Sequence, residues 1–164
     1  MNHMSEPLGA YLNDHLAGAT LGSDHAAQLR EYSDGAPFAA EAERIAVEVE
    51  EDRQALIDLM SRLDVGRNPI KQAGAWVAEK AGRIKFTGVS SGDADYGLYM
   101  ALETMALGVV GKLKLWQALK HVQPTLPELS APELDRLIAR AVSQHETLEA
   151  ERARRAPFTF TPSA

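Results

Sequence analysis

The stretch IAVEVEEDRQALIDLMSRL, residues 45–63, decides the fold class. Its apolar residues recur every three or four positions, which places them along one face of an α-helix. The stripe that they form consists of Ile45, Val49, Leu56, Leu59 and Leu63. Asp52 falls on the same stripe. The pattern therefore predicts an amphipathic helix that turns one ionisable side chain toward a hydrophobic core.

The rest of the chain repeats this helical pattern between clear stop signals. Alanine and leucine supply 45 of the 164 residues, and no run rich in Val, Ile and Thr alternates with period two before residue 157. We therefore expect an all-α fold. Four of its helices should be long, at about 26 to 28 residues or roughly 40 Å each, and a shorter helix of about 18 residues should lie between the second and third of them.

Proline, glycine and capping residues set the expected helix ends. The first helix opens at Ser5-Glu6-Pro7 and runs to about Tyr32, and the second begins at Pro37 and stops at a glycine C-cap, Gly66. The third covers about 69–86 and the fourth about 94–122. A capping box, Ser130 to Glu133, opens the fifth, and Pro157 closes it.

These boundaries predict a single helical-bundle domain, residues 1–156, followed by a C-terminal tail, residues 157–164. Two arrangements fit the short connections. The five helices can form an antiparallel meander. Alternatively, the short third helix runs back along the bundle, and the second and fourth helices then lie parallel.

Composition excludes several functional classes. The chain has no cysteine, so disulfides, thiolate zinc sites and iron–sulfur clusters are ruled out. A net charge of −6 argues against nucleic-acid and anionic-membrane partners, which favour a basic face. The sequence has no transmembrane stretch, and its first residues do not resemble a signal peptide, so the expected location is cytoplasmic.

Three predicted helices each place one ionisable residue where an apolar one is expected. These residues are His15, Asp52 and His145, and Glu48 and Glu103 lie at the edges of two apolar faces. At 1.5 Å rise per residue the three inward residues fall within roughly 9 Å of one height in the bundle. A buried aspartate needs a partner, and a histidine is the expected one.

Three interpretations of this cluster remain open. It can be a hydrogen-bonded network that sets helix register. It can instead be a metal or ligand site for Fe, Mn or Zn, with His15, Asp52 and His145 as ligands and Glu48 and Glu103 as further carboxylates. Acid–base chemistry without a metal is a third possibility.

The layout of four long helices with a shorter one between the second and third resembles the ferritin-like superfamily. The segment YLNDHLA, residues 11–17, is similar to the start of uncharacterised bacterial members. Di-iron members of that superfamily carry Glu-x-x-His on two helices. Here Glu51 stands where the first histidine is wanted, and His145 is kept without its glutamate.

The resemblance implies a ferritin-like bundle without an intact di-iron site, hence no cofactor and a structural or protein-interaction role rather than catalysis. A homodimer is expected because helix four is apolar on more than one face, through Leu98, Met105, Leu115 and Leu119. Lys112 is expected on a solvated face. The acidic second helix should pair with the basic third one.

Overall fold

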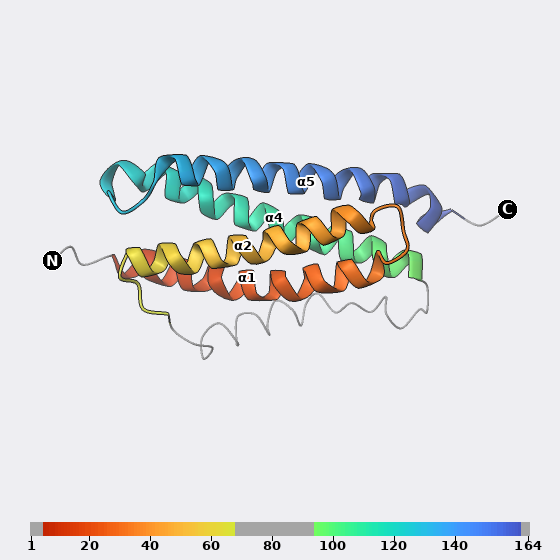
Figure 1. Ribbon diagram of the computed structural model, residues 1–164, viewed down its shortest axis with the longest axis horizontal. Coiled ribbons are helices and arrows are strands. Elements are labelled where there is room, and N and C mark those ends of the chain that lie inside the picture. Colours follow the sequence, from red (N-terminus) through yellow and green to blue (C-terminus); the bar gives the residue numbers. More distant parts are fainter. Residues whose placement is uncertain (1–4, 68–93, 162–164) are drawn as a thin grey trace.

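The computed structural model describes residues 5–67 and 94–161, and every regular element within them is helical (Figure 1). The elements are α1 (Glu6–Tyr32), α2 (Ala39–Arg62), α4 (Ala94–Val122), the 3₁₀ turn η2 (Gln123–Thr125) and α5 (Ala131–Phe160). The all-α prediction is confirmed for these residues. The predicted short helix, residues 69–86, lies outside them.

The four long helices pack as two antiparallel hairpins, α1–α2 and α4–α5, with α1 against α4 (Figure 1). Helices α2 and α5 are antiparallel, because Arg62 contacts Glu133 whereas Glu48 contacts Gln144. Helices α4 and α5 are also antiparallel, because Lys112 contacts Gln144 whereas Lys120 pairs with Asp135. Helices α2 and α4 are therefore parallel, as in the second of the two arrangements expected.

Most helix ends lie close to the capping signals in the sequence. α1 has a proline in its first turn, and the Ser130 hydroxyl caps α5 by accepting a hydrogen bond from the Glu133 N–H at 3.4 Å. Helix α4 has the bounds that were expected, and α2 begins two residues after Pro37.

The end of α2 differs from the prediction of a glycine cap at Gly66. The left-handed residue is Asp64, with φ of 52°. The Val65 N–H donates to the Met60 carbonyl at 2.9 Å, and the Asp64 N–H donates to the Ser61 carbonyl at 3.2 Å. These two bonds form a Schellman motif slightly earlier in the chain than expected. Val65 then folds back onto the core, where it packs beside Gly9.

Helix α5 also passes the residue that was expected to end it. Pro157 lies inside the helix, which continues to Phe160, so the first residues of the predicted tail belong to α5. Proline removes one backbone N–H, but two local bonds hold the last turn together. Thr159 Oγ1 donates to the Arg155 carbonyl, and the Thr161 N–H donates to the Pro157 carbonyl. The Phe160 ring also packs edge-on against Tyr99, with 4.8 Å between ring centroids.

The core is built largely from leucine, with the Trp116 ring buried inside it. Helix α4 contacts both α1 and α5, which explains its unusual apolar breadth. The side chains that prompted the expectation of a homodimer are all buried within the bundle: Leu98, Met105, Leu115 and Leu119. The apolar breadth that these four residues give to α4 therefore serves internal packing.

Candidate functional site

Asp52 is buried at the centre of the bundle, with 1% of its surface exposed, as its place on the apolar stripe predicted. Its partners are cations rather than a histidine, so that part of the prediction is wrong. Lys112 Nζ of α4 lies 2.5 Å from Asp52 Oδ2, and Arg140 Nη2 of α5 donates to Asp52 Oδ1. One carboxylate thus joins three helices.

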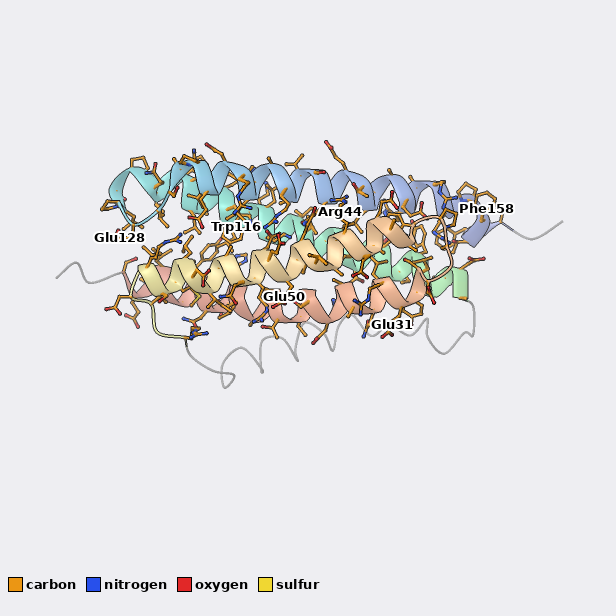
Figure 2. All side chains as sticks on the ribbon, in the orientation of Figure 1. Glu31, Arg44, Glu50, Trp116, Glu128 and Phe158 are labelled. Atoms are coloured by element: carbon orange, nitrogen blue, oxygen red, sulfur yellow. The ribbon has the colours of Figure 1, made fainter. Side chains whose placement is uncertain are left out.

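The network continues outward from Asp52 through amide and carboxylate groups. Lys112 Nζ also donates to Gln144 Oε1 at 2.6 Å, and Gln144 Nε2 donates to Glu48 Oε2 at 2.8 Å. Arg140 Nη1 donates to Glu51 Oε2 at 2.5 Å. Arg44, labelled in Figure 2, also belongs to this hydrogen-bonded network and donates to Glu48 Oε1 at 2.8 Å. The α2–α5 seam is therefore bridged by polar side chains.

Lys112 is mostly buried, with 15% of its side chain exposed, and it does not lie on the solvated face that we expected. Met105, Val109, Lys112, Trp116 and Leu119 follow one another at spacings of three and four on α4. This apolar stripe marks Lys112 as inward-facing. A long side chain in that position can extend its ammonium group across the core to a carboxylate.

The inward face of α5 is shifted by one residue at two places. His145 was expected to face the core, but its neighbour Gln144 faces it and is fully buried. In the same way Leu137 is fully buried, whereas its neighbour Ile138 is only partly buried. The sequence permits either choice, because in both pairs the competing residues are neighbours along the helix. Gln144 is selected since it can bond to both Lys112 and Glu48, and His145 is left only partly buried.

The other two candidate ligands lie in different surroundings. His15 of α1 is half-buried and packs edge-on against Tyr11, with 4.5 Å between ring centroids. Burial lowers the pKa of His15, and nearby Asp14 only partly opposes this. Glu103 pairs at 3.4 Å with Arg152, which also donates to the Tyr99 hydroxyl at 2.6 Å.

The five candidate metal ligands are consequently not gathered into one site. Within the two described ranges, no group of three His, Asp or Glu residues is placed to hold a metal ion. Glu48 and Asp52 share a network, but the groups that fill their coordination positions are Arg44, Gln144, Lys112 and Arg140. The oxygens of these two carboxylates are thus taken up by protein donors.

The electrostatics fit a set of ions that compensate one another. Burial lowers the pKa of Lys112, and the charge and hydrogen bond of Asp52 raise it part of the way back. Burial alone would raise the pKa of Glu48, but the hydrogen bonds from Gln144 and Arg44 and the charges of Arg44 and Arg140 hold it below its usual range. Both shifts follow from removing charges from water and pairing them.

The acidic second helix finds part of its compensation on α5. Glu51 and Asp52 both pair with Arg140, while Arg62 of α2 pairs with Glu133. The predicted pairing with the basic segment 69–86 falls outside the described residues.

None of the helices that the structure describes has the length and apolar character of a membrane span. Comparisons with protein-family models, with curated proteins and with solved structures return no match.

Proposed function

We propose that this chain is a cytoplasmic, ferritin-like helical bundle with a structural or protein-interaction role, and that it has an internal charge network in place of a metal centre. One observation carries the proposal: Asp52, the most buried carboxylate among the described residues, accepts hydrogen bonds from Lys112 and Arg140. A divalent cation bound there would have to displace two positive side chains.

The course of the chain supports the ferritin-like part of the proposal. Helices α2 and α4 are parallel, so α2 ends and α4 begins at opposite ends of the bundle (Figure 1). Ferritin-like bundles have two hairpins joined by one long crossover, which gives the same helix directions. The resemblance noted for residues 11–17 points to the same superfamily.

The chemistry of the network supports a role in holding helices together. Removing two ions from water costs several kcal/mol per ion, and the cost is recovered only when their geometry and hydrogen bonds are good. Here each oxygen of Asp52 has its own cation, and Lys112 is shared with Gln144. Such a network penalises any shift of α2 against α4 and α5, because a shift by one turn would leave charges buried without partners.

Metal titration of the full chain, purified without a His-tag or chelator, tests the proposal. Fe²⁺, Mn²⁺ and Zn²⁺ are added separately to the wild-type protein and to Asp52→Asn, and the melting temperature is followed. Binding to the folded state raises the melting temperature by mass action. We expect no metal-dependent shift in either protein. A rise in the wild type that Asp52→Asn abolishes would establish a metal centre at this position and overturn the proposal.

A further inference from the structure

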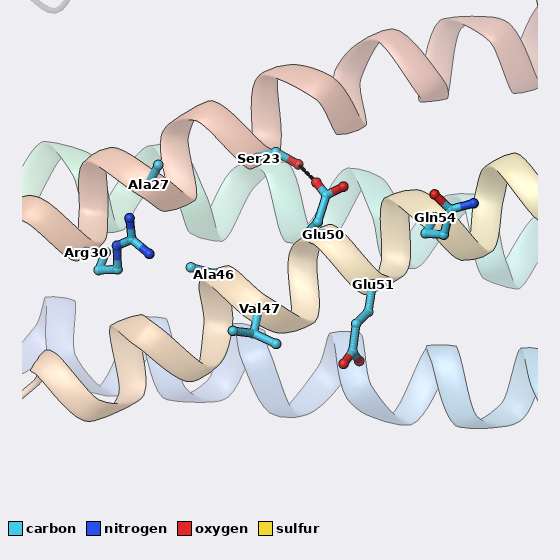
Figure 3. Close-up of a pocket in the computed structure, with 8 residues that line it drawn as sticks. All are labelled: Ser23, Ala27, Arg30, Ala46, Val47, Glu50, Glu51 and Gln54. Atoms are coloured by element: carbon cyan, nitrogen blue, oxygen red, sulfur yellow. Dashed lines mark hydrogen bonds between the residues drawn. The ribbon is translucent and has the colours of Figure 1, made fainter.

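The shallow groove along the outer side of the α1–α2 hairpin carries charged residues that are paired within the chain (Figure 3). Arg30 pairs with Glu43 at 3.6 Å, and Glu50 pairs with Arg53 at 2.7 Å. Glu51 belongs to the charge network described above. Buried polar groups without a partner lie instead inside the bundle.

Two buried N–H donors in the core have no hydrogen-bond acceptor in the part of the chain that the structure describes. They are Trp116 Nε1 of α4, whose residue is labelled in Figure 2, and Arg140 Nε of α5. Trp116 is 1% exposed, so its indole does not reach bulk water. Most buried polar side-chain atoms in native proteins have a partner, which is a protein group or an ordered water molecule. Both donors therefore require an acceptor.

The two donors lie at the same level of the bundle. The register of α4 against α5 is set by the contact between Lys112 and Gln144 and by the pair of Lys120 with Asp135. The tryptophan and the arginine each lie between these two contacts on their own helix, about one turn from either one. The indole and the guanidinium therefore belong to residues that stand opposite one another on antiparallel helices.

Both donors also lie beside the Asp52 carboxylate. Trp116 follows Lys112 by four residues, so the two side chains share one face of α4. The guanidinium of Arg140 is planar, and its Nε–H lies on the same edge as Nη2, the nitrogen that donates to Asp52 Oδ1. An acceptor for the Arg140 Nε–H is thus a neighbour of Asp52.

A water molecule has the chemistry that this position needs. Its oxygen can accept from the indole and from the guanidinium, and one of its protons can go to Asp52. Each oxygen of Asp52 accepts from one cation, and a carboxylate oxygen has room for a second donor. Three hydrogen bonds are the usual number for a buried water. A metal ion does not fit because both groups are donors, and a halide ion would be repelled by the carboxylate.

We propose that the core charge network binds a water molecule, which accepts hydrogen bonds from Trp116 Nε1 and Arg140 Nε and donates one to Asp52. The inference rests on the charge-paired core proposed above and adds a ligand to it. The bound water satisfies two buried donors at once. It also joins α4, α5 and α2, the same three helices that the ion pairs join.

Magnetisation transfer between water and the Trp116 indole proton tests the site by NMR. The chain has two tryptophans, and the indole signal that disappears in Trp116→Phe, or remains in Trp76→Phe, is that of Trp116. The measurement itself is made on the wild-type chain. A water molecule held in the core gives laboratory-frame and rotating-frame Overhauser effects of opposite sign at this proton, and we expect this result. No effect, or effects of equal sign that report proton exchange alone, would overturn the inference.

The ammonium protons of Lys112 offer a second route for such a signal, because they exchange with water. Transfer by this route grows as the pH is raised, since exchange of ammonium protons is catalysed by base. Direct transfer from a bound water does not depend on this exchange, so we expect the same intensity across the pH range in which the protein stays folded. An intensity that rises with pH would assign the signal to Lys112 and remove the water.

The choice between water and a halide ion is tested with the same indole signal. Spectra are recorded in sodium chloride, sodium bromide and sodium sulfate at equal ionic strength. With water as the ligand, the Trp116 indole shifts should be the same in all three salts. A shift that follows the halide concentration would show that a halide accepts these hydrogen bonds, and the water assignment would be wrong.

The water test and the metal test fail in different ways. An indole proton without a bound water would leave Asp52 paired with Lys112 and Arg140, and the charge-paired core would stand. Melting that is stabilised by metal through Asp52 would remove the charge-paired core itself.

Discussion

Lys112 Nζ lies 2.5 Å from Asp52 Oδ2 and so joins α4 to α2, two helices at opposite corners of the bundle. Arg140 approaches the same carboxylate from α5, the helix that lies between them. A diagonal contact of this kind needs a long side chain, because neighbouring packed helices already stand 8–10 Å apart. The core polar cluster therefore depends on the length of the Lys112 side chain as much as on Asp52.

Removing the Asp52 carboxylate should destabilise the fold strongly. In Asp52→Ala, Lys112 and Arg140 lose their shared counter-charge, and breaking a buried pair in this way costs about 3–5 kcal/mol. Glu51→Ala is the control, since Glu51 also pairs with Arg140 but is 58% exposed, and it should cost no more than about 1 kcal/mol. Urea unfolding followed by circular dichroism measures both. Equal costs would show that the cations reach water once Asp52 is gone.

Replacing the whole charged triad should be far milder than removing one member. The combined variant Asp52→Leu, Lys112→Met and Arg140→Met leaves no unpaired ion among the three positions, and such replacements are often neutral or stabilising by about 1–4 kcal/mol. Asp52→Leu alone keeps both cations and should behave like Asp52→Ala. Urea midpoints of the two variants are compared. A combined variant less stable than Asp52→Leu alone would mean that the three ions do not act as a unit.

Acid should remove the stabilisation that Glu48 supplies. Its pKa is depressed in the folded protein, below an unfolded value of about 4.3. The contribution is therefore fully present above the unfolded pKa and is lost as the pH falls through the folded pKa. The difference in free energy of unfolding between wild type and Glu48→Gln should shrink from about pH 6 toward about pH 3. A difference that is constant or grows in acid would contradict the assignment.

The end of α2 offers a stabilising substitution. Asp64 adopts φ of 52°, a conformation that glycine adopts without the cost an L side chain incurs, so Asp64→Gly should stabilise the protein by about 1 kcal/mol. Gly66→Ala is the control. Gly66 does not have a positive φ, and a Cβ there would meet no atom within 4 Å, so the change should lie within about 0.5 kcal/mol. Thermal melts of both variants test the placement of the cap.

Helix bounds and the inward position of Asp52 were predictable, because both depend on residues close in sequence. Capping groups act within one turn, and apolar spacing identifies a face from a single helix. The partners of Asp52 were not predicted. Lys112 was assigned to the surface from its charge, although its spacing from Val109 and Trp116 places it on the buried stripe. Pro157 was interpreted as a helix stop. The contact between Phe160 and Tyr99, which α5 makes beyond this proline, joins two distant segments and could not be predicted from the local sequence.

The sequence by itself determined an all-helical chain without cysteine, the ends of most helices, and one aspartate aimed at the core. Tertiary structure decided that α2 and α4 are parallel, that Gln144 rather than His145 faces inward, and that Lys112 and Arg140 neutralise Asp52. The physical reason is the range of the interactions. Helix propensity and capping act over a few residues, whereas ion pairing in a core depends on the register of three helices and on which side chains are long enough to meet.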